Sequence, residues 1–243
     1  MTIASQPIAT AKDVREALRG KADPATAQHA QRFFKTAPGE YGEGDMFLGI
    51  RVPEIRKLLR RFRTIKLPAL RPLLRSKYHE ERLFAVLMLA GWCSKSLPDD
   101  RRQAIYDFYL ANKQWVNNWD LVDGSAPYVV GRYLRQRDRA ILYQLIASAV
   151  LWDRRIAVLA TYDFIKEGDF ADTLKLARRC LTDEHDLMHK AAGWMLREIG
   201  KRDQAAVEPF LVEHCRTMPR TLLRYSIEHL DKGRRAAFLR GQP

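Results

Sequence analysis

The sequence predicts an all-α protein, a curved α-solenoid of HEAT-like antiparallel helix pairs. Apolar residues recur at helical spacing along nearly every segment, and no segment alternates apolar and polar residues as a strand would. Glycine or proline interrupts the pattern at short intervals, which is typical of short helices joined by turns. A weak internal repeat of roughly 35 residues indicates that the helices come in pairs.

The helical pattern is clearest in HEERLFAVLMLAGW, where Leu83, Val86, Leu87 and Ala90 share one stripe. The segment 152–166 has the same arrangement. Breaks are expected at Pro38 to Gly44, Pro53, Pro68, Pro98, Gly124 to Pro127, Gly168, Gly200, Pro219 and Gly233. They divide the chain into about a dozen helices joined by short turns.

The internal repeat aligns small or apolar residues at Gly49, Ala85, Val122, Ala157 and Ala192. An array of helix pairs buries one layer against the next and leaves a concave face whose side chains need not pack. Binding chemistry is expected on that face. We expect a single HEAT-like repeat domain over residues 11–243, preceded by a flexible N-terminal tail over residues 1–10.

The charge balance indicates a polyanionic partner. Lys and Arg number 42 against 29 Asp and Glu, which leaves a net charge of +13. Nucleic acid is the first candidate, because cations that neutralise phosphates release condensed counterions. A ribosome or an anionic membrane fits the composition too, as does a basic, well-solvated protein. The basic residues extend along the whole chain, which favours a folded basic surface over a charged tail.

Other features exclude several classes of protein. The N-terminus has no secretory signal, and the longest apolar run, Leu83 to Cys93, is too short to span a bilayer, so we expect a cytoplasmic protein. Three cysteines, far apart and in no CxxC pair, predict buried thiols. The glycines of APGEYGEGD lack the GK[ST] that follows a nucleotide-binding loop. No cofactor is expected.

A metal site is also not expected. His185 and His189 have zincin spacing, but Asp186 stands where that motif requires Glu, and no third ligand is evident.

The segment from Gln114 to Leu134 carries the strongest functional signal. Trp119 and Asp123 are four residues apart, so an aromatic ring and a carboxylate share one helix face. Polar residues around them are unusual for a helix that serves only as core. The alternative interpretation is that Trp119 packs inside and Asp123 caps a helix beginning near Ser125.

Two further clusters hold cations beside tryptophan. Arg154 and Arg155 follow Trp152, and because adjacent residues cannot share one helix face, at least one arginine is expected to point toward the groove. Farther along, a single stripe carries Lys190, Trp194, Arg197 and Lys201. A basic stripe with an indole suits a phosphate backbone beside a base or sugar, although a solvated charged helix would look the same.

Four blocks of this sequence resemble the AlkD-like DNA alkylation repair proteins, which are built of HEAT-like repeats. They are FLGIRVPEIRKLLR from Phe47, WDLVDGSAP from Trp119, LWDRRIAVLA from Leu151 and HKAAGWMLRE from His189. The resemblance places the catalytic carboxylate on Asp123. It places the two aromatic walls of a lesion cleft on Trp119 and Trp194, and a groove arginine on Arg155.

The resemblance implies further contacts with DNA. Arg51 matches a position that often carries a polar DNA-contacting side chain, and Phe33 lies near an aromatic contact. Arg154, Lys190 and Arg197 are expected to add phosphate contacts. Asp163 is a departure, because some members of the family carry lysine there.

The activity implied by the resemblance is an alkylpurine DNA glycosylase, which removes N3- or N7-alkylated purines from double-stranded DNA in base excision repair. Neither a membrane nor an obligate protein partner is expected. Two alternatives remain. One is a non-catalytic HEAT-like repeat protein that binds damaged or structured nucleic acid. The other is an interaction scaffold for an acidic partner.

Overall fold

Helices account for the regular structure of the chain in a computed structural model that describes residues 8–243. The described residues form sixteen α-helices, three further short helical turns and an isolated bridge between Met46 and Tyr78. The chain divides into two compact units that meet in sequence between Ser125 and Ala126. The prediction of an all-α protein made of packed helix pairs is confirmed.

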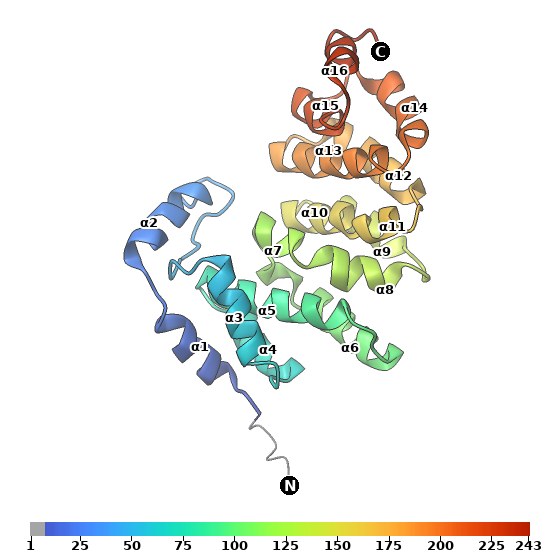
Figure 1. Cartoon of the computed structure of the whole chain (residues 1–243). Helices are drawn as coiled ribbons and strands as arrows, with labels where there is room; N and C mark the ends of the chain where they lie inside the picture. The colour runs from blue at the N-terminus through green and yellow to red at the C-terminus, as the bar shows by residue number, and fades with distance from the viewer. Residues whose placement is uncertain (1–7) are drawn as a thin grey trace. The chain divides into compact units, whose positions relative to one another are not determined.

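The first unit is organised around α5, which is buried on almost every side. Its helices are α1 (Ala11–Arg19), α2 (Pro24–Phe33), α3 (Val52–Arg61), α4 (Leu67–Leu74), α5 (His79–Cys93), α6 (Asp99–Leu110) and α7 (Trp119–Asp123), with a 3₁₀ turn, η1 (Lys113–Trp115). Helices α3, α4 and α7 all pack on α5 (Figure 1). The expected amphipathic stripe is therefore only part of a wider buried surface, which also includes Glu80, Glu81 and Arg82.

The first four helices of this unit begin at a capping side chain or at a proline of the first turn. Thr10 caps α1 in a capping box with Asp13, and Asp23 accepts the amide of Ala25 at the start of α2. Pro53 and Pro68 lie in the first turns of α3 and α4, where a missing amide hydrogen costs nothing. These prolines begin helices, as expected from their position at breaks in the pattern.

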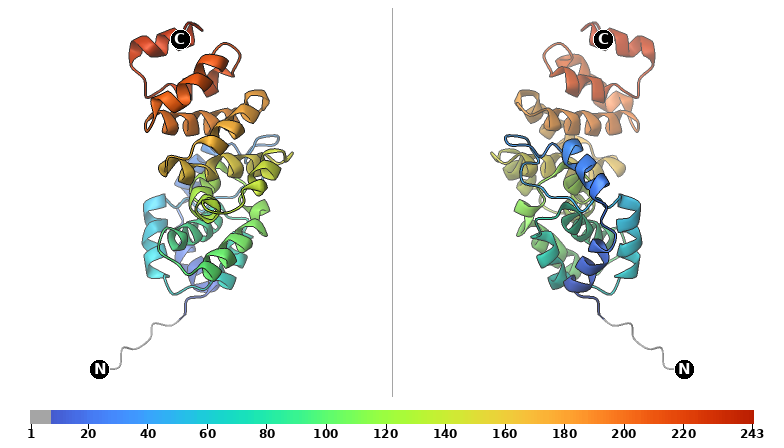
Figure 2. Two further views of the ribbon diagram at one scale, coloured as in Figure 1. Left: turned by 90° about the vertical axis from the view of Figure 1, so that its right-hand side faces the viewer. Right: turned by 90° about the vertical axis from the view of Figure 1, so that its left-hand side faces the viewer.

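The second unit is organised around α10 and α13, which lie side by side (Figure 2). Its elements are η2 (Pro127–Gly131), a π-helical turn, α8 (Arg132–Leu134), α9 (Ala140–Ile146), α10 (Leu151–Ala160), α11 (Tyr162–Lys166), α12 (Ala171–Arg179), η3 (Cys180–Thr182), a 3₁₀ turn, α13 (Asp186–Gly200), α14 (Gln204–His214), α15 (Arg220–Ser226) and α16 (Lys232–Leu239). Helix α13 also packs closely on α15, where a side chain at Gly193 would meet Tyr225 and the carbonyl of Leu222.

The repeat landmarks are partly correct. Ala85, Val122, Ala157 and Ala192 are fully buried on four different helices, as expected for packing positions. Gly49 lies before α3 and not on a helix. It has a φ of +81°, and a Cβ there would lie 2.0 Å from the carbonyl oxygen of Asp23, so only glycine fits. Gly233 lies in the first turn of α16, so the predicted break falls at the start of a helix, as it does at Pro53 and Pro68.

The remaining sequence predictions concern the N-terminal tail, the domain bounds, the cysteines and membrane-spanning helices. The predicted tail lies mostly outside the described residues, and the single domain over 11–243 stays a prediction. All three cysteines are buried and none is in a disulfide, as predicted for buried thiols. Within residues 8–243, no helix combines the length and the apolar character needed to cross a membrane.

Candidate active site and nucleic-acid interface

Trp119 and Asp123 are the first and last residues of α7, so the predicted helical spacing of the pair is correct. Both side chains are half-buried. Asn118 caps the start of the helix, since its side-chain oxygen accepts the amide of Trp119 at 2.8 Å, and Gly124 follows its last residue. A helix of five residues has little stability of its own, so tertiary contacts must hold the pair in place.

A buried polar network, formed by Asp45, His79, Arg82, Asn118 and Asp120, supplies those contacts. His79 Nε2 lies 2.8 Å from Asp120 Oδ2 on α7, and Nδ1 lies 3.2 Å from Asp45 Oδ2. Asn118 donates to the same Asp45 oxygen at 3.1 Å, and Arg82 Nη2 donates to Asp45 Oδ1 at 2.5 Å. The network thus ties the start of α7 to the start of α5.

The carboxylates determine the charge of His79. Burial alone would lower the pKa of this imidazole, but the charge and hydrogen bond of Asp120 and the hydrogen bond of Asp45 raise it to about 9. Burial would raise the pKa of Asp45, yet His79, Arg82 and Asn118 bring it below its ordinary value. His79 is therefore an imidazolium at neutral pH, and both ring nitrogens donate to carboxylates.

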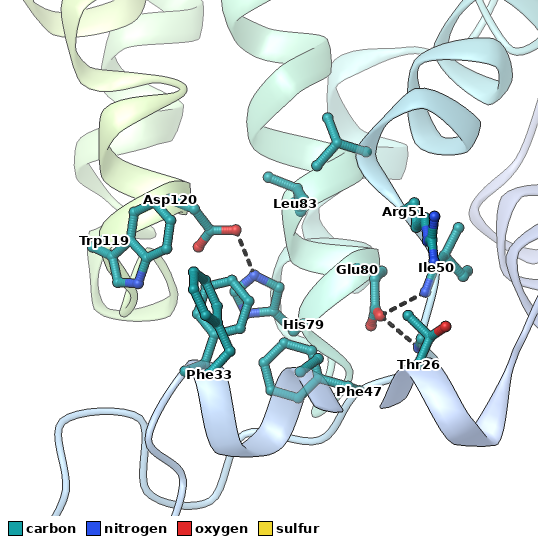
Figure 3. A pocket seen from close by; sticks show the side chains of 14 residues that line it. Thr26, Phe33, Phe47, Ile50, Arg51, His79, Glu80, Leu83, Trp119 and Asp120 are labelled. Atoms are coloured by element: carbon teal, nitrogen blue, oxygen red, sulfur yellow. Dashed lines mark hydrogen bonds and ion pairs between the residues drawn. The ribbon is translucent and has the colours of Figure 1, made fainter. Parts of the chain in front are cut away.

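Beside this network the first unit contains a cavity of about 410 Å³ (Figure 3). Aromatic side chains dominate its lining. Phe34 stacks on Trp119 with ring centroids 5.3 Å apart and on Phe47 with centroids 5.0 Å apart. Phe33 meets the edge of Trp119 at 5.9 Å and is 59% exposed. The other lining residues include His79, Glu80, Leu83, Asp120 and Arg51.

Glu80 shapes the wall opposite α7. Its buried carboxylate accepts the backbone amides of Leu48, Gly49 and Ile50 at 2.9, 2.7 and 3.1 Å. Three such hydrogen bonds satisfy the carboxylate and fix the segment that leads into α3. The left-handed conformation of Gly49 belongs to the same turn.

Sequence reasoning missed most of this architecture. Asp45, His79 and Asp120 carry no recognisable motif, because they come together only through the packing of α5 and α7. A signal existed in HEERL, where four ionisable residues open a helix that is otherwise apolar. Buried charges need partners, so such a cluster predicts an internal network.

In the second unit, Trp194 lies on α13 beside the buried stripe and not within it. Ala191, Met195 and Ile199 are fully buried, whereas Trp194 is half-buried. Its Nε1 donates to Glu198 Oε1 at 3.3 Å, and its ring lies 6.0 Å from that of Tyr162. The expectation that the core does not need this indole agrees with its exposure.

The cations around Trp194 are paired with carboxylates. Lys190 lies 2.8 Å from Asp186, and Lys201 lies 2.9 Å from Glu198. Arg197 pairs with Glu228 of the segment that follows α15. The stripe is thus close to neutral, which the helical spacing of its cations did not reveal.

Arg154 and Arg155 have different surroundings. Arg154 forms a two-pronged pair with Asp183, with nitrogen–oxygen distances of 2.7 and 3.3 Å. Arg155 is only 4% exposed, and its Nη1 donates to the carbonyl of Leu187 at 2.5 Å. The groove arginine of the resemblance therefore also joins α10 to the first turn of α13.

The remaining residues singled out by the sequence have structural partners. Asp163 is buried and accepts from Arg135 at 2.8 Å. His185 caps α13 by accepting the amide of Leu187, and His189 Nε2 lies 2.6 Å from the carbonyl oxygen of Asp183. Over residues 8–243, no three histidine, cysteine or acidic side chains form a metal-binding group.

Exposed positive charge is concentrated on α3 and α4. Residues 51–77 hold ten Lys and Arg and one acidic residue, Glu54, a net +9 of the chain's +13, and all ten cations are exposed. Within the described residues, Arg56 and Arg60 form no ion pair. Arg51, the expected DNA contact, begins this cationic segment at the rim of the aromatic cavity.

The fold defines this molecule as an α-helical repeat protein with a strongly basic helix pair. The chain belongs to the DNA alkylation repair enzyme family, whose sequence pattern it matches over residues 14–230. Among solved structures, it is similar to a predicted DNA alkylation repair enzyme from Enterococcus faecalis, with 19% identity and a TM-score of 0.66. That similarity covers 87% of this chain and 98% of the other. No curated protein matches.

Membership of the family gives the chain a role in the repair of DNA alkylation damage, as an enzyme that acts on DNA.

Proposed function

We propose that this protein is a DNA glycosylase that hydrolyses the N-glycosidic bond of cationic N3- or N7-alkylated purines in duplex DNA, the first step of base excision repair. The observation that carries the proposal is the position of Asp123. It is half-buried at the end of α7, one turn from Trp119, and the polar network of Asp45 and His79 holds that helix.

The proposed reaction needs a carboxylate but no general acid. Alkylation at N3 or N7 gives the purine a positive charge. When the bond between C1′ and the base nitrogen breaks, its electron pair neutralises the leaving base. The sugar becomes an oxocarbenium ion, which the Asp123 carboxylate stabilises more in the transition state than in the ground state. Water then bonds to C1′, and its proton leaves to Asp123 or to solvent.

Other residues serve binding in this proposal. The indole face of Trp119, one turn from Asp123, attracts the positive charge of the lesion and of the developing sugar cation, and Trp194 of the second unit offers an indole face to DNA. Arg154 and Arg155 contact DNA phosphates from the start of α10. Lys190 and Arg197 contact phosphates beside Trp194 on α13. Phe33 and Arg51 contact DNA from α2 and from the start of α3. Because most of these cations already have protein partners, the exposed arginines of α3 supply the larger share of phosphate contact.

A second candidate function is non-catalytic recognition of damaged or structured nucleic acid. The exposed cations of residues 51–77 favour it equally, because charge binds DNA with or without chemistry. Release of free base separates the two functions.

The test is excision by the Asp123→Asn variant. Asparagine keeps the size of the side chain and removes its charge, so release of N7-methylguanine from duplex DNA should fall at least about a hundredfold, the scale of one lost electrostatic stabiliser. Duplex binding should persist or tighten. Asp100→Asn, an exposed carboxylate on α6, is the matched control and should keep wild-type activity.

The wild type should also spare uracil and hypoxanthine, because these bases leave as anions unless an acid protonates them. Full activity in Asp123→Asn would assign the chemistry to another residue. Absence of excision by the wild type would favour the non-catalytic function.

A further inference from the structure

The second unit carries a cluster of three aromatic rings and two cations, the aromatic–cation cluster, formed by Tyr128, Tyr162, Lys166, Trp194 and Arg202. Helix α11 supplies Tyr162 and Lys166, and it packs on α13 (Figure 1) and on η2. Tyr128 belongs to η2, Trp194 belongs to α13, and Arg202 follows the end of α13. Packing of these elements therefore brings the five side chains together.

Tyr162 is the common neighbour in the cluster. Its ring centroid lies 6.0 Å from that of Trp194 and 4.5 Å from Lys166 Nζ. The guanidinium of Arg202 lies 5.9 Å from the same centroid, but it also pairs with Glu198 at 3.1 Å. The charge of Arg202 is therefore already shared with an acid of the protein.

Lys166 is an exposed cation that two rings hold in place. Its Nζ lies 5.4 Å from the ring centroid of Tyr128 as well as 4.5 Å from that of Tyr162, and the faces of such rings attract an ammonium group. Ordering a lysine side chain costs conformational entropy. Because the rings already restrict this side chain, it loses less entropy when it binds an anion.

The charge of Lys166 is not balanced by an acid. Among the described residues it forms no ion pair. The acidic side chains closest to it in sequence, Asp163 and Glu167, both pair with Arg135 at 2.7 Å. An exposed ammonium group that is held in position without a carboxylate partner is suited to an anion from outside the chain.

We propose that Lys166, held over Tyr128 and Tyr162, binds a phosphate of the DNA backbone close to the nucleotide that Trp194 contacts. The inference rests on the duplex binding of the proposed function and adds one contact to it. Lysine contacts to phosphate position a protein on the duplex without reading its sequence. Because the chain belongs to a family of DNA repair enzymes, duplex DNA is the polyanion that supplies the phosphate.

Binding of undamaged duplex tests the contact without any requirement for catalysis. Lys166→Gln should weaken binding about five- to tenfold and make the log–log salt slope shallower by about 1, the loss of one phosphate contact. Lys232→Gln is the matched control, because Lys232 is exposed in the first turn of α16 and, within residues 8–243, forms no ion pair and lies over no ring. It should leave affinity and slope nearly unchanged. Equal effects of the two variants, or no effect of Lys166→Gln, would overturn the proposal.

A double-variant cycle tests whether the rings act through the lysine. Tyr128 is suitable because, in the described part of the chain, it has no ring contact with Trp194. Tyr128→Leu removes the ring at constant net charge and should weaken duplex binding about twofold to threefold, the scale of an exposed cation–π contact, whereas Tyr128→Phe keeps the ring and should match the wild type. In the Lys166→Gln background, Tyr128→Leu should have no further effect. Additive losses would show that Tyr128 does not hold the lysine.

Excision kinetics separate this contact from the chemistry. Lys166→Gln should raise KM for duplex DNA containing N7-methylguanine and leave kcat unchanged, because a phosphate is bound equally in the ground state and the transition state. Asp123→Asn should instead lower kcat. If the wild type releases no alkylated base, the glycosylase function fails, and the duplex-binding measurements still decide whether Lys166 binds a phosphate.

Discussion

Burial and the neighbouring carboxylates have opposite effects on the pKa of His79. The low-polarity surroundings favour a neutral imidazole, yet Asp120 and Asp45 stabilise the charged form and raise its pKa to about 9. Because the folded-state pKa exceeds the ordinary value of 6.5, the linked stability is fully present below pH 6.5 and is lost as pH rises through 9.

Alkaline pH should therefore weaken the attachment of α7. Between pH 7 and pH 10, the wild type should lose up to about 3 kcal/mol more free energy of unfolding than a His79→Gln variant, which has no proton to release. Urea denaturation of both proteins at the two pH values measures the difference.

The His79 ring signal in NMR provides an independent check, since it should titrate near pH 9 and not near 6.5. A titration near 6.5 would show that the two carboxylates do not hold the imidazolium.

At the scale of elements, α13 has one face that is buried in the core and a neighbouring face that is partly exposed. One face contributes Ala191, Met195 and Ile199 to the core, and a neighbouring face carries Trp194 among paired cations. The helix thus combines a structural surface with a candidate contact for DNA. The same division occurs in α7, where Leu121 and Val122 are buried between the half-buried Trp119 and Asp123.

Trp194→Ala should separate the two roles of α13. The indole is half-buried, so its removal should lower the free energy of unfolding by less than about 2 kcal/mol, whereas a fully buried tryptophan costs about 3–5 kcal/mol. Excision of N7-methylguanine should fall strongly. Met195→Ala, in the core of the same helix, should cost about 2–5 kcal/mol and serves as the comparison.

If Trp194→Ala lowers the melting temperature as much as Met195→Ala does, then the indole belongs to the core and its proposed role at the lesion is wrong.

For the whole molecule, the net charge of +13 is less informative than its distribution. Many cations of the second unit are paired with acids, as Arg178 is with Glu213 at 2.7 Å. A cation that is paired with an acid attracts a phosphate only weakly. The exposed cations of residues 51–77 outnumber their acidic neighbours by ten to one, so this segment should dominate long-range attraction to DNA.

Binding of duplex DNA should weaken steeply as salt increases, and the slope should depend on which arginines are removed. Arg56 and Arg60 form no ion pair with any described residue, so the Arg56→Gln, Arg60→Gln double variant should make the log–log salt slope shallower by about 2. Arg178→Gln removes a paired cation and should leave the slope nearly unchanged. A shallow salt dependence in the wild type would contradict the electrostatic model of binding.

Helical periodicity and local motifs were sufficient to predict the helical repeats, the shared face of Trp119 and Asp123, and the family. These features depend on residues within one or two turns of each other, and the physics of a single helix determines them. The four sequence blocks that resemble the family are local in the same sense.

Tertiary packing decided the rest. The pairing of His79 with Asp45 and Asp120 joins residues 34 and 41 positions apart, and the aromatic cavity combines side chains from α2, α5 and α7. The ion pairs that neutralise the α13 stripe likewise include a partner 31 residues away. No pattern along the chain encodes these distances, because burial and pairing depend on which helix faces meet, and only the folded structure brings those faces together.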